Sequence, residues 1–234
     1  MGLTGKVIAI TGGFGTLGLA VGKAAASQGA QVALIDRALA PAAAQLPAPL
    51  SAALLLGGID LSAFEAAQQA FSAVAQRYGG LDVLINVAGA FRWQTLEDGD
   101  LANWDLLYHI NLKTAVASSK SVLPHMRKRG GGRIINIGAG AAAKAAAGMG
   151  AYAASKAGVA KLTESLAEEL KDEGINVNAV LPSIIDTPIN RADMPTADFK
   201  RWVTPDAVAD VIMFLASDAA RAVTGALLPV SGRV

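Results

Sequence analysis

Short apolar runs recur along the chain, and each is followed by a longer segment in which apolar residues have helical spacing. Within a run the apolar residues do not alternate with polar ones, so both faces of each predicted strand should be buried. The runs lie at 6–12, 31–36, 52–60, 81–89, 132–139, 175–182 and 225–232. Strands of this kind that alternate with helices are typical of parallel sheets. The sequence therefore predicts an α/β fold, a single Rossmann-type doubly wound parallel sheet of about seven strands with helices on both faces.

The segments with helical spacing lie at 17–30, 61–79, 102–130, 150–174 and 205–218. Pro41, Pro47 and Pro49 argue against a long helix between 38 and 53, because proline is not tolerated in a helix interior. No linker or repeat interrupts the alternation of strands and helices, so residues 1–234 are expected to form a single domain. The one long loop, at about 187–205, has a length typical of a lid or binding loop.

Composition excludes several classes of function. A net charge of +1, with no long basic run, argues against binding to nucleic acid. The chain contains no cysteine, which excludes disulfides and thiolate catalysis and fits a cytoplasmic protein. The two histidines, His109 and His125, are too few for a histidine metal cluster, so no metal is expected. The sequence shows neither a signal-peptide pattern nor an apolar run of about 18 residues, so no membrane association is expected.

The stretch "TGGFGTLG" follows the first predicted strand and opens the first predicted helix. Gly13, Gly15 and Gly18 satisfy the pattern G-x-G-x-x-G, in which glycines allow a tight turn and the close approach of a pyrophosphate. The N-terminus of the helix adds unpaired N–H groups and a positive dipole end. Because of its position between strand and helix, the pattern favours a dinucleotide site over a purely structural turn.

Asp36 ends the second predicted strand, where a carboxylate can accept hydrogen bonds from the adenosine ribose. The same carboxylate would repel a 2′-phosphate, whereas the neighbouring Arg37 could accept one. We therefore expect NAD(H) to be preferred and NADP(H) to be possible. The alternative for Asp36 is an ordinary turn residue.

Tyr152 and Lys156 are four residues apart on a predicted helix and hence on one face of it. A cation close to a phenol favours the phenolate and so lowers the pKa of the tyrosine. The pair is therefore predicted to form an acid catalyst next to the cofactor. The lysine could also hold the nicotinamide ribose.

With these motifs in place, the chain resembles the short-chain dehydrogenase/reductase family over nearly its whole length. The resemblance lies in the glycine turn, "NVAG" at 86–89, the mid-helix Asn111, the Tyr152/Lys156 pair and "PSIIDT" at 182–187. It implies a dinucleotide-binding and catalytic domain in which Tyr152, Lys156 and Asn111 are catalytic. The implied cofactor contacts are Gly12, Gly13, Gly15, Leu17, Gly18, Asp36, Arg37, Asp60, Leu61, Asn86, Ala88, Gly89, Tyr152, Lys156, Pro182, Ile185 and Thr187. The alternative for Asn111 is a buried helix residue that bonds backbone.

Two positions depart from the family pattern. Thr16 replaces the usual second glycine of the turn, with Gly15 one place earlier. Ala139 stands where the family has a catalytic serine, thirteen residues before the tyrosine, that hydrogen-bonds the substrate carbonyl. Loss of one such donor costs about 2.7–4 kcal/mol of transition-state stabilisation in related sites, so a simple ketone reductase should suffer.

The dihydropteridine reductase branch of the family also has alanine at this position, and the chain resembles it elsewhere. The branch shares an aromatic residue after V-A-G, here Phe91, a G-M-x-x-Y approach to the tyrosine, here with Met149, and the loop "DTPINRADMPTADFKRW" at 186–202. By this resemblance Phe91 and Met149 would contact the substrate.

Three functional hypotheses follow. The first is an NAD(P)H-dependent reductase of quinonoid dihydropterin or a similar conjugated substrate. The alternative is a carbonyl or 3-oxoacyl reductase of the wider family, and the third hypothesis is a non-catalytic NAD-binding protein. The expected partners are a small-molecule substrate and further copies of the chain, in a homodimer or homotetramer, which is common in this family.

Overall fold

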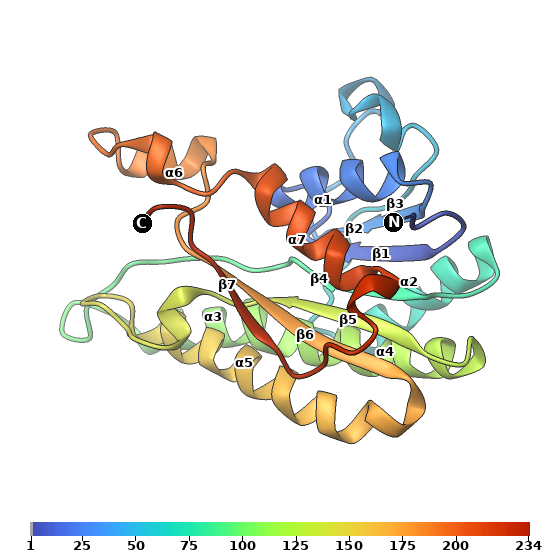
Figure 1. The fold of residues 1–234 in the computed structure, drawn as a ribbon. Coiled ribbons are helices and arrows are strands. Elements are labelled where there is room, and N and C mark those ends of the chain that lie inside the picture. Colours follow the sequence, from blue (N-terminus) through green and yellow to red (C-terminus); the bar gives the residue numbers. More distant parts are fainter. Residues whose placement is uncertain (1) are drawn as a thin grey trace.

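The computed structural model describes residues 2–234 and has one seven-stranded sheet with helices on both faces (Figure 1). The strands are β1 (Val7–Thr11), β2 (Gln31–Ile35), β3 (Leu54–Leu56), β4 (Val83–Asn86), β5 (Gly132–Ile137), β6 (Ile175–Pro182) and β7 (Leu227–Val230). Their order is β3-β2-β1-β4-β5-β6-β7, and every neighbouring pair is parallel. The predicted fold class is therefore confirmed. The strand order reverses between β1 and β4, the point at which sheets of this type bind ligands.

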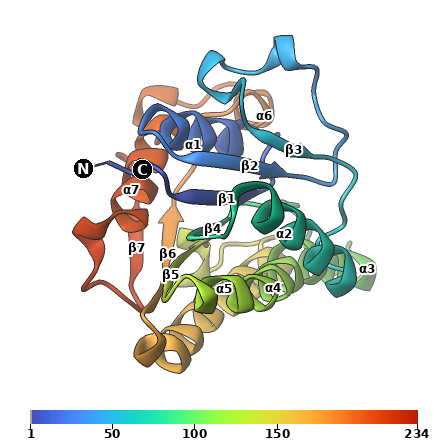
Figure 2. The ribbon, with the colours of Figure 1, turned by 90° about the vertical axis from the view of Figure 1, so that its right-hand side faces the viewer.

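The two faces of the sheet are covered by different helices (Figure 2). Helices α1 (Thr16–Ser27) and α7 (Pro205–Ala216) pack on one face, where Ile8 and Ile10 of β1 join their core. Helices α2 (Phe64–Tyr78), α4 (Thr114–Lys128) and α5 (Gly150–Leu170) cover the other face, where Val7 and Ala9 of the same strand point. Alternate residues of β1 thus enter opposite cores, which explains why the strand is apolar throughout.

The helix predicted over 102–130 is divided by a π-helical turn. It consists of α3 (Leu101–Leu107), the turn Tyr108–Lys113, and α4. The Thr114 hydroxyl donates to the carbonyl oxygen of His109 at 2.9 Å, within the widened turn. The turn carries Asn111 inward, where the residue is 1% exposed. Turns of this kind occur frequently at functional sites, and the periodicity of the sequence did not indicate one.

Other predicted boundaries also shift. β3 and β4 are shorter than the runs at 52–60 and 81–89, because at Gly57 and beyond Asn86 the chain turns away from the sheet. At Gly57, a Cβ would collide with the backbone nitrogen of Ala40. The stretch 38–53 forms only two short 3₁₀ turns, as its prolines predict. The long loop at 187–205 contains α6 (Pro188–Asp193) and a 3₁₀ turn, Phe199–Arg201, which were not predicted.

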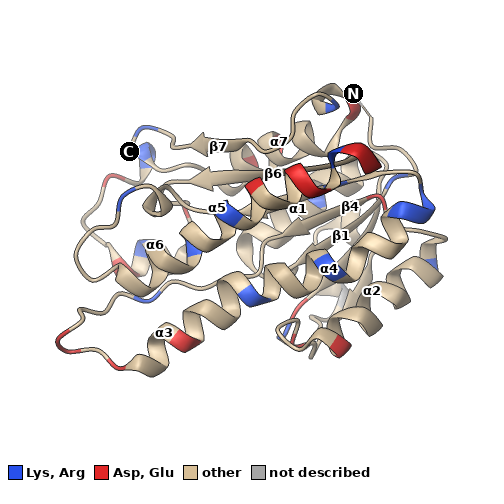
Figure 3. Cartoon of the chain, turned by 90° about the horizontal axis from the view of Figure 1, so that it is seen from below, with Lys and Arg blue, Asp and Glu red and all other residues tan. Residues whose placement is uncertain are grey.

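A helix crosses a membrane only if it is long and apolar. Within residues 2–234, none of the helices combines the length and the apolar character needed to cross a bilayer. Seen from below in Figure 3, α4 carries only lysine and arginine among its charged residues, whereas α5 carries both basic and acidic residues.

Candidate active site

A cleft of about 770 Å³ lies at the carboxyl ends of the strands. It extends from the glycine-rich turn to Tyr152 and is bounded by the segment that follows β6. Sixteen predicted site residues line it: Gly12, Gly15, Leu17, Gly18, Asp36, Arg37, Asp60, Leu61, Ala88, Gly89, Phe91, Tyr152, Lys156, Pro182, Ile185 and Thr187. The structure therefore brings together, in one cleft, residues that are up to 175 positions apart in the chain (187 − 12).

Four predicted residues do not line the cleft: Gly13, Asn86, Asn111 and Met149. Gly13 packs against β2, where a Cβ would lie 2.7 Å from the Cβ of Leu34. The Asn86 side chain turns into the core, and its Nδ2 donates to the Oδ1 of Asn136 at 2.9 Å. Both residues therefore lie behind the cleft wall and pack in the structure, and their contact with the cofactor stays a prediction.

Further lining residues were not among the predicted contacts: Thr16, Ile59, Ser62, Val87, Ala90, Leu106, His109, Ile110, Thr114, Ile137, Gly138, Ala139, Ser183, Ile189 and Asn190. Many are direct neighbours of predicted residues, so the strand ends could have indicated them. Ile189 and Asn190 belong to α6, and the three residues from 106 to 110 belong to the divided helix. Their placement depends on structure that the sequence pattern did not reveal.

The glycine turn forms a cradle that fits the diphosphate of a dinucleotide. Gly12 has φ of +63°, in the left-handed region that favours glycine. At Gly18 a Cβ would collide with the carbonyl oxygen of Gly12, so only glycine lets α1 begin so close to the strand. The N-cap residue of α1 is Gly15, which has no side chain to bond the first N–H groups of the helix. These groups are left to bind a ligand phosphate.

Asp36 is held in a fixed orientation at the end of β2. Its Oδ2 accepts a hydrogen bond from the backbone nitrogen of Phe14 at 3.0 Å, and its Oδ1 accepts one from Ala38 at 3.0 Å. Asp60 also lines this end of the cleft, and hydrogen bonds from Ser62 lower the pKa of its carboxyl group. The adenosine end of the cleft therefore presents ordered carboxylates, which suit ribose hydroxyls and disfavour an additional phosphate.

Tyr152 and Lys156 lie in the first two turns of α5 and both line the cleft. Burial raises the pKa of Tyr152 to about 12, contrary to the expectation that Lys156 would lower it. Lys156 is itself 5% exposed; burial lowers its pKa to about 8, and its Nζ donates to the carbonyl oxygen of Ile137 at 2.7 Å. Desolvation therefore outweighs the lysine charge at the phenol, and Tyr152 holds its proton at neutral pH.

Asn111 forms a bracket behind the cleft through its side-chain amide. Its Oδ1 accepts from the backbone nitrogen of Ala90 at 2.8 Å, and its Nδ2 donates to the Ala90 carbonyl oxygen at 3.0 Å. A Cβ at Gly89 would lie 2.8 Å from that Oδ1, so the close approach requires glycine. The side chain thus bonds the backbone of Ala90 and also the Ser155 hydroxyl, and its catalytic role stays a prediction.

Ala139 brings a methyl group to the cleft where the family pattern has a serine hydroxyl. It lies two residues after the end of β5 and is 6% exposed. Two hydroxyls also line the cleft. Ser183 Oγ donates its proton to the Ser231 carbonyl oxygen at 2.7 Å and so is not free to donate to a substrate. Thr187 Oγ1 accepts a hydrogen bond from the Asn190 nitrogen at 3.2 Å and keeps its own proton for donation.

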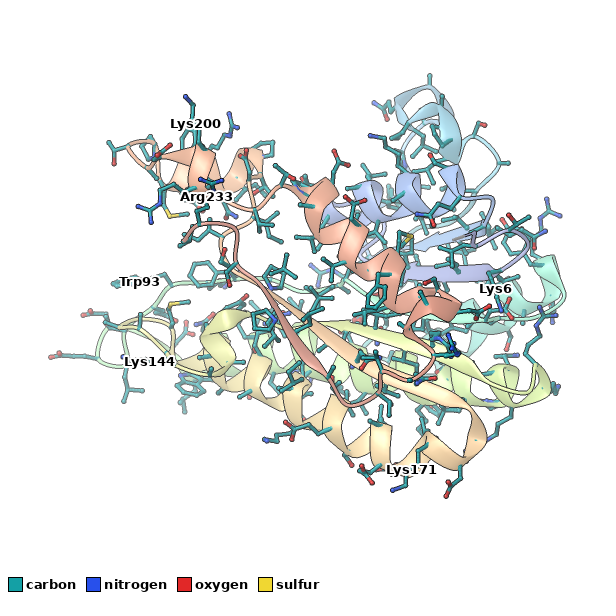
Figure 4. The ribbon with its side chains drawn as sticks, in the orientation of Figure 1. Lys6, Trp93, Lys144, Lys171, Lys200 and Arg233 are labelled. Carbon is teal, nitrogen blue, oxygen red and sulfur yellow. The ribbon has the colours of Figure 1, made fainter. Side chains whose placement is uncertain are left out.

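The segment after β6 is an ordered structure on one side of the cleft. Arg191 forms two hydrogen bonds with Asp186, at 2.6 and 2.7 Å, and its guanidinium lies 4.8 Å from the centre of the Phe199 ring. Ile189 of α6 is 72% exposed although it borders the cleft. Figure 4 shows Trp93 at the same end of the molecule as Lys144, and the Trp93 Nε1 donates to the carbonyl oxygen of Ala147. The cleft is thus bordered by the segment after β6 and by the exposed side chain of Ile189.

The comparisons with known proteins agree with this arrangement. The family described as short chain dehydrogenase matches residues 6–198. The chain is 33% identical over 246 residues to 2-(S)-hydroxypropyl-CoM dehydrogenase 3 of Xanthobacter autotrophicus, with 98% of this chain and 96% of that protein covered. It is 33% identical over 246 residues to the 3-oxoacyl-[acyl-carrier-protein] reductase of Thermotoga maritima, with 99% and 98% covered. Among solved structures, levodione reductase superposes with a TM-score of 0.90 at 28% identity, with 98% and 97% covered.

Proposed function

This chain belongs to the short-chain dehydrogenase family of NAD(P)-dependent oxidoreductases, and from that premise we propose that it reduces a carbonyl group of a small molecule. The observation that carries the proposal is the position of the buried Tyr152 phenol in the cleft that begins at the glycine turn. The phenol carries its proton at neutral pH, and burial raises its pKa to about 12, so it keeps the proton at alkaline pH as well. A protonated acid next to a hydride source is what reduction of a carbonyl requires.

Some residues of the cleft would bind the cofactor, and others would take part in proton transfer. When bound, the reduced nicotinamide supplies a hydride. The N-terminus of α1 would hold the diphosphate, and Asp36 would accept hydrogen bonds from the adenosine ribose. Lys156 would hold the nicotinamide ribose and keep a positive charge near the phenol of Tyr152. The phenol would donate its proton to the oxygen of the substrate as that oxygen gains negative charge.

Asp36 supports a preference for NAD(H). Two backbone N–H groups fix its carboxylate at the rim of the cleft, so a 2′-phosphate would meet a negative charge that cannot turn away. Arg37 also borders the cleft, which keeps NADP(H) possible. Direct titration of the protein with NADH and NADPH tests the preference, and tighter binding of NADPH would show that Arg37 outweighs Asp36.

The relatives support carbonyl or 3-oxoacyl reduction better than the dihydropteridine reductase interpretation of the sequence. One of them is named as a reductase of 3-oxoacyl carrier protein, and another as an acetoacetyl-CoA reductase, at 30% identity. We therefore place a carbonyl or 3-oxoacyl substrate first.

One observation keeps a dihydropteridine-like substrate as the second candidate. Ala139 lines the cleft without a hydroxyl group, and the Ser183 hydroxyl, also in the cleft wall, donates to the Ser231 carbonyl oxygen instead. A quinonoid dihydropterin spreads the negative charge of hydride arrival over ring nitrogens. Such a substrate needs a proton from Tyr152 but no second donor next to it.

The test is the rate of NADH oxidation with acetoacetyl thioesters, cyclic diketones, quinones and quinonoid dihydropterin, with the Tyr152→Phe variant as the control. The proposal expects turnover with ketone substrates that is lost in the variant. Turnover with dihydropterin alone would favour the second candidate. NADH binding without oxidation by any of these substrates would support the third hypothesis, a non-catalytic NAD-binding protein.

The prediction of a homodimer or homotetramer has support on the surface of the divided helix. Leu101, Trp104, Tyr108 and Val116 are large apolar side chains that are 77%, 40%, 50% and 40% exposed. They follow one another at helical spacing over α3, the π turn and α4. We propose that another copy covers this stripe, in a cytoplasmic enzyme. Light scattering coupled to size exclusion should give twice or four times the 23.7 kDa chain mass, and a mass of one chain would contradict the proposal.

A further inference from the structure

Ser155 connects the catalytic helix to the segment that follows β4. Its hydroxyl accepts a hydrogen bond from Nδ2 of Asn111 at 2.9 Å and donates one to the carbonyl oxygen of Tyr152 at 2.7 Å. The same Asn111 amide clamps both backbone groups of Ala90, at 2.8 and 3.0 Å. We call this chain of hydrogen bonds, from Ala90 through Asn111 and Ser155 to the Tyr152 carbonyl, the Asn–Ser bracket.

The bracket joins three segments that are far apart in the sequence. Ala90 follows β4, Asn111 lies in the π-helical turn, and Ser155 lies one helical turn after the start of α5. Ser155 is 4% exposed and Asn111 is 1% exposed, so water does not compete for their hydrogen bonds. Removing one partner from such a site leaves buried polar groups unsatisfied, which is costly. The π turn is what allows the Asn111 side chain to reach both neighbours.

The bracket fixes the surroundings of the tyrosine from two sides. On one side it holds the backbone of Tyr152 through Ser155. On the other side it holds Ala90. The ring of the next residue, Phe91, lies perpendicular to the ring of Tyr152, with the two ring centres 4.9 Å apart. Phe91 and Tyr152 both line the cleft. A shift of either segment would therefore change the space between the phenol and the opposing ring.

We propose that Ser155 is a positioning residue for the reaction, which sets the position of Tyr152 relative to the 89–91 segment through Asn111. The proposal rests on the proposed role of Tyr152 as proton donor. Its consequence is a loss of turnover when the Ser155 hydroxyl is removed, since small misplacements of a reacting group reduce rates strongly. Binding of the cofactor depends on the glycine turn and Asp36 and should change little.

The chain offers a matched control for a buried helical serine. Ser121 of α4 is 4% exposed, and its hydroxyl donates to the carbonyl oxygen of Ala117 in the same helix at 2.8 Å. Ser121 does not line the cleft. Replacing it by alanine removes a buried hydroxyl and one hydrogen bond to helix backbone, without touching the bracket.

The first experiment compares kcat and KM for Ser155→Ala, Ser155→Thr and Ser121→Ala in the intact protein. We expect kcat of Ser155→Ala to fall about tenfold with KM for NADH nearly unchanged, because the loss is in positioning and not in binding. Ser155→Thr keeps the hydroxyl and should restore most of kcat, and Ser121→Ala should behave as the unaltered protein. An unchanged kcat in Ser155→Ala, or an equal loss in Ser121→Ala, would overturn the proposal.

The second experiment is a double-mutant cycle with Asn111→Ala. If both residues act through one bracket, the double variant should lose about as much turnover as Asn111→Ala alone, since contacting residues are not additive. Losses that multiply would show that the residues act independently and would overturn the proposal. Tyr152→Phe, measured in parallel, distinguishes a failure of the proposed function from a failure of the Asn–Ser bracket. If that variant keeps its turnover, the proposed function fails. If it is inactive while Ser155→Ala is unaffected, only the bracket fails.

Discussion

The two ends of the cleft differ in how they are built. At the glycine turn the contacts come mainly from the first two strands and the start of α1: Gly18 approaches the Gly12 carbonyl oxygen, and the Phe14 nitrogen donates to Asp36 at the end of β2. At Tyr152 the contacts join side chains and backbone from β4, the π-helical turn, β5 and α5. We infer that cofactor binding depends mainly on the glycine turn and the strands next to it. Proton transfer from Tyr152 depends on several segments that are far apart in the sequence being held in place. Substitutions at the two ends should therefore separate binding from turnover.

The largest effect is expected at the chemical end, from Tyr152→Phe. Loss of the proton donor should reduce turnover by about 10²–10⁴-fold, the usual contribution of general acid catalysis. The affinity for NADH, measured by fluorescence titration, should stay the same, because the phenyl ring remains and the glycine turn is untouched. Turnover close to that of the unaltered protein would show that another group supplies the proton.

A pH profile should sharpen the comparison through Lys156. Burial lowers its pKa to about 8, so the lysine is charged below that pH and neutral above it. If the charge supports proton donation by Tyr152, kcat should be constant at lower pH and decline about tenfold per unit as the pH rises above 8. Lys156→Arg keeps the charge throughout this range and should lose the alkaline decline, whatever its absolute rate. A kcat that is constant to pH 9.5 in the unaltered protein would contradict the role of the lysine charge.

At the nucleotide end, Asp36→Ala should change the affinities for NADH and NADPH. It should not change kcat at saturating NADH. Removal of the fixed carboxylate should lower the ratio of the NADPH dissociation constant to the NADH dissociation constant about tenfold. This change corresponds to about 1.4 kcal/mol, the contribution of one charged contact. The control is Asp218→Ala, which removes an exposed carboxylate outside the cleft. If Asp36→Ala also lowered kcat at saturating NADH, the two ends would not be separable in the way the structure indicates.

The same difference explains how much the sequence could predict. The parallel sheet, the glycine turn and the Tyr152/Lys156 pair follow from short-range patterns, because each motif lies within one strand, turn or helix. The π-helical turn at Tyr108–Lys113 could not be predicted, since it accompanies hydrogen bonds of Asn111 to Ala90 and Ser155, which are far away in the sequence. The hydrogen bond of the Asn86 side chain to Asn136 could not be predicted either, because Asn136 lies on the neighbouring strand, 50 residues away in the chain.

The electrostatics of the catalytic pair also lay beyond the sequence. Spacing alone predicts that Lys156 lowers the pKa of Tyr152. The structure shows that burial raises the pKa of Tyr152 to about 12, an effect of packing that spacing does not contain. The α6 helix and the cleft contacts of Ile189 were missed for a similar reason, because a short helix of six residues has little periodicity of its own.

The central claim is that the protein is a carbonyl reductase in which Tyr152 acts without the usual serine, and Ala139→Ser tests it most directly. The measurement is kcat/KM for ketone substrates and for quinonoid dihydropterin, in the unaltered protein and in the variant. The account predicts that the added hydroxyl, at a position that lines the cleft, raises kcat/KM for ketones about tenfold, since about 1.4 kcal/mol of added stabilisation of the transition state is tenfold in rate. No gain on ketones, together with dihydropterin reduction by the unaltered protein, would contradict the claim and favour the conjugated substrate.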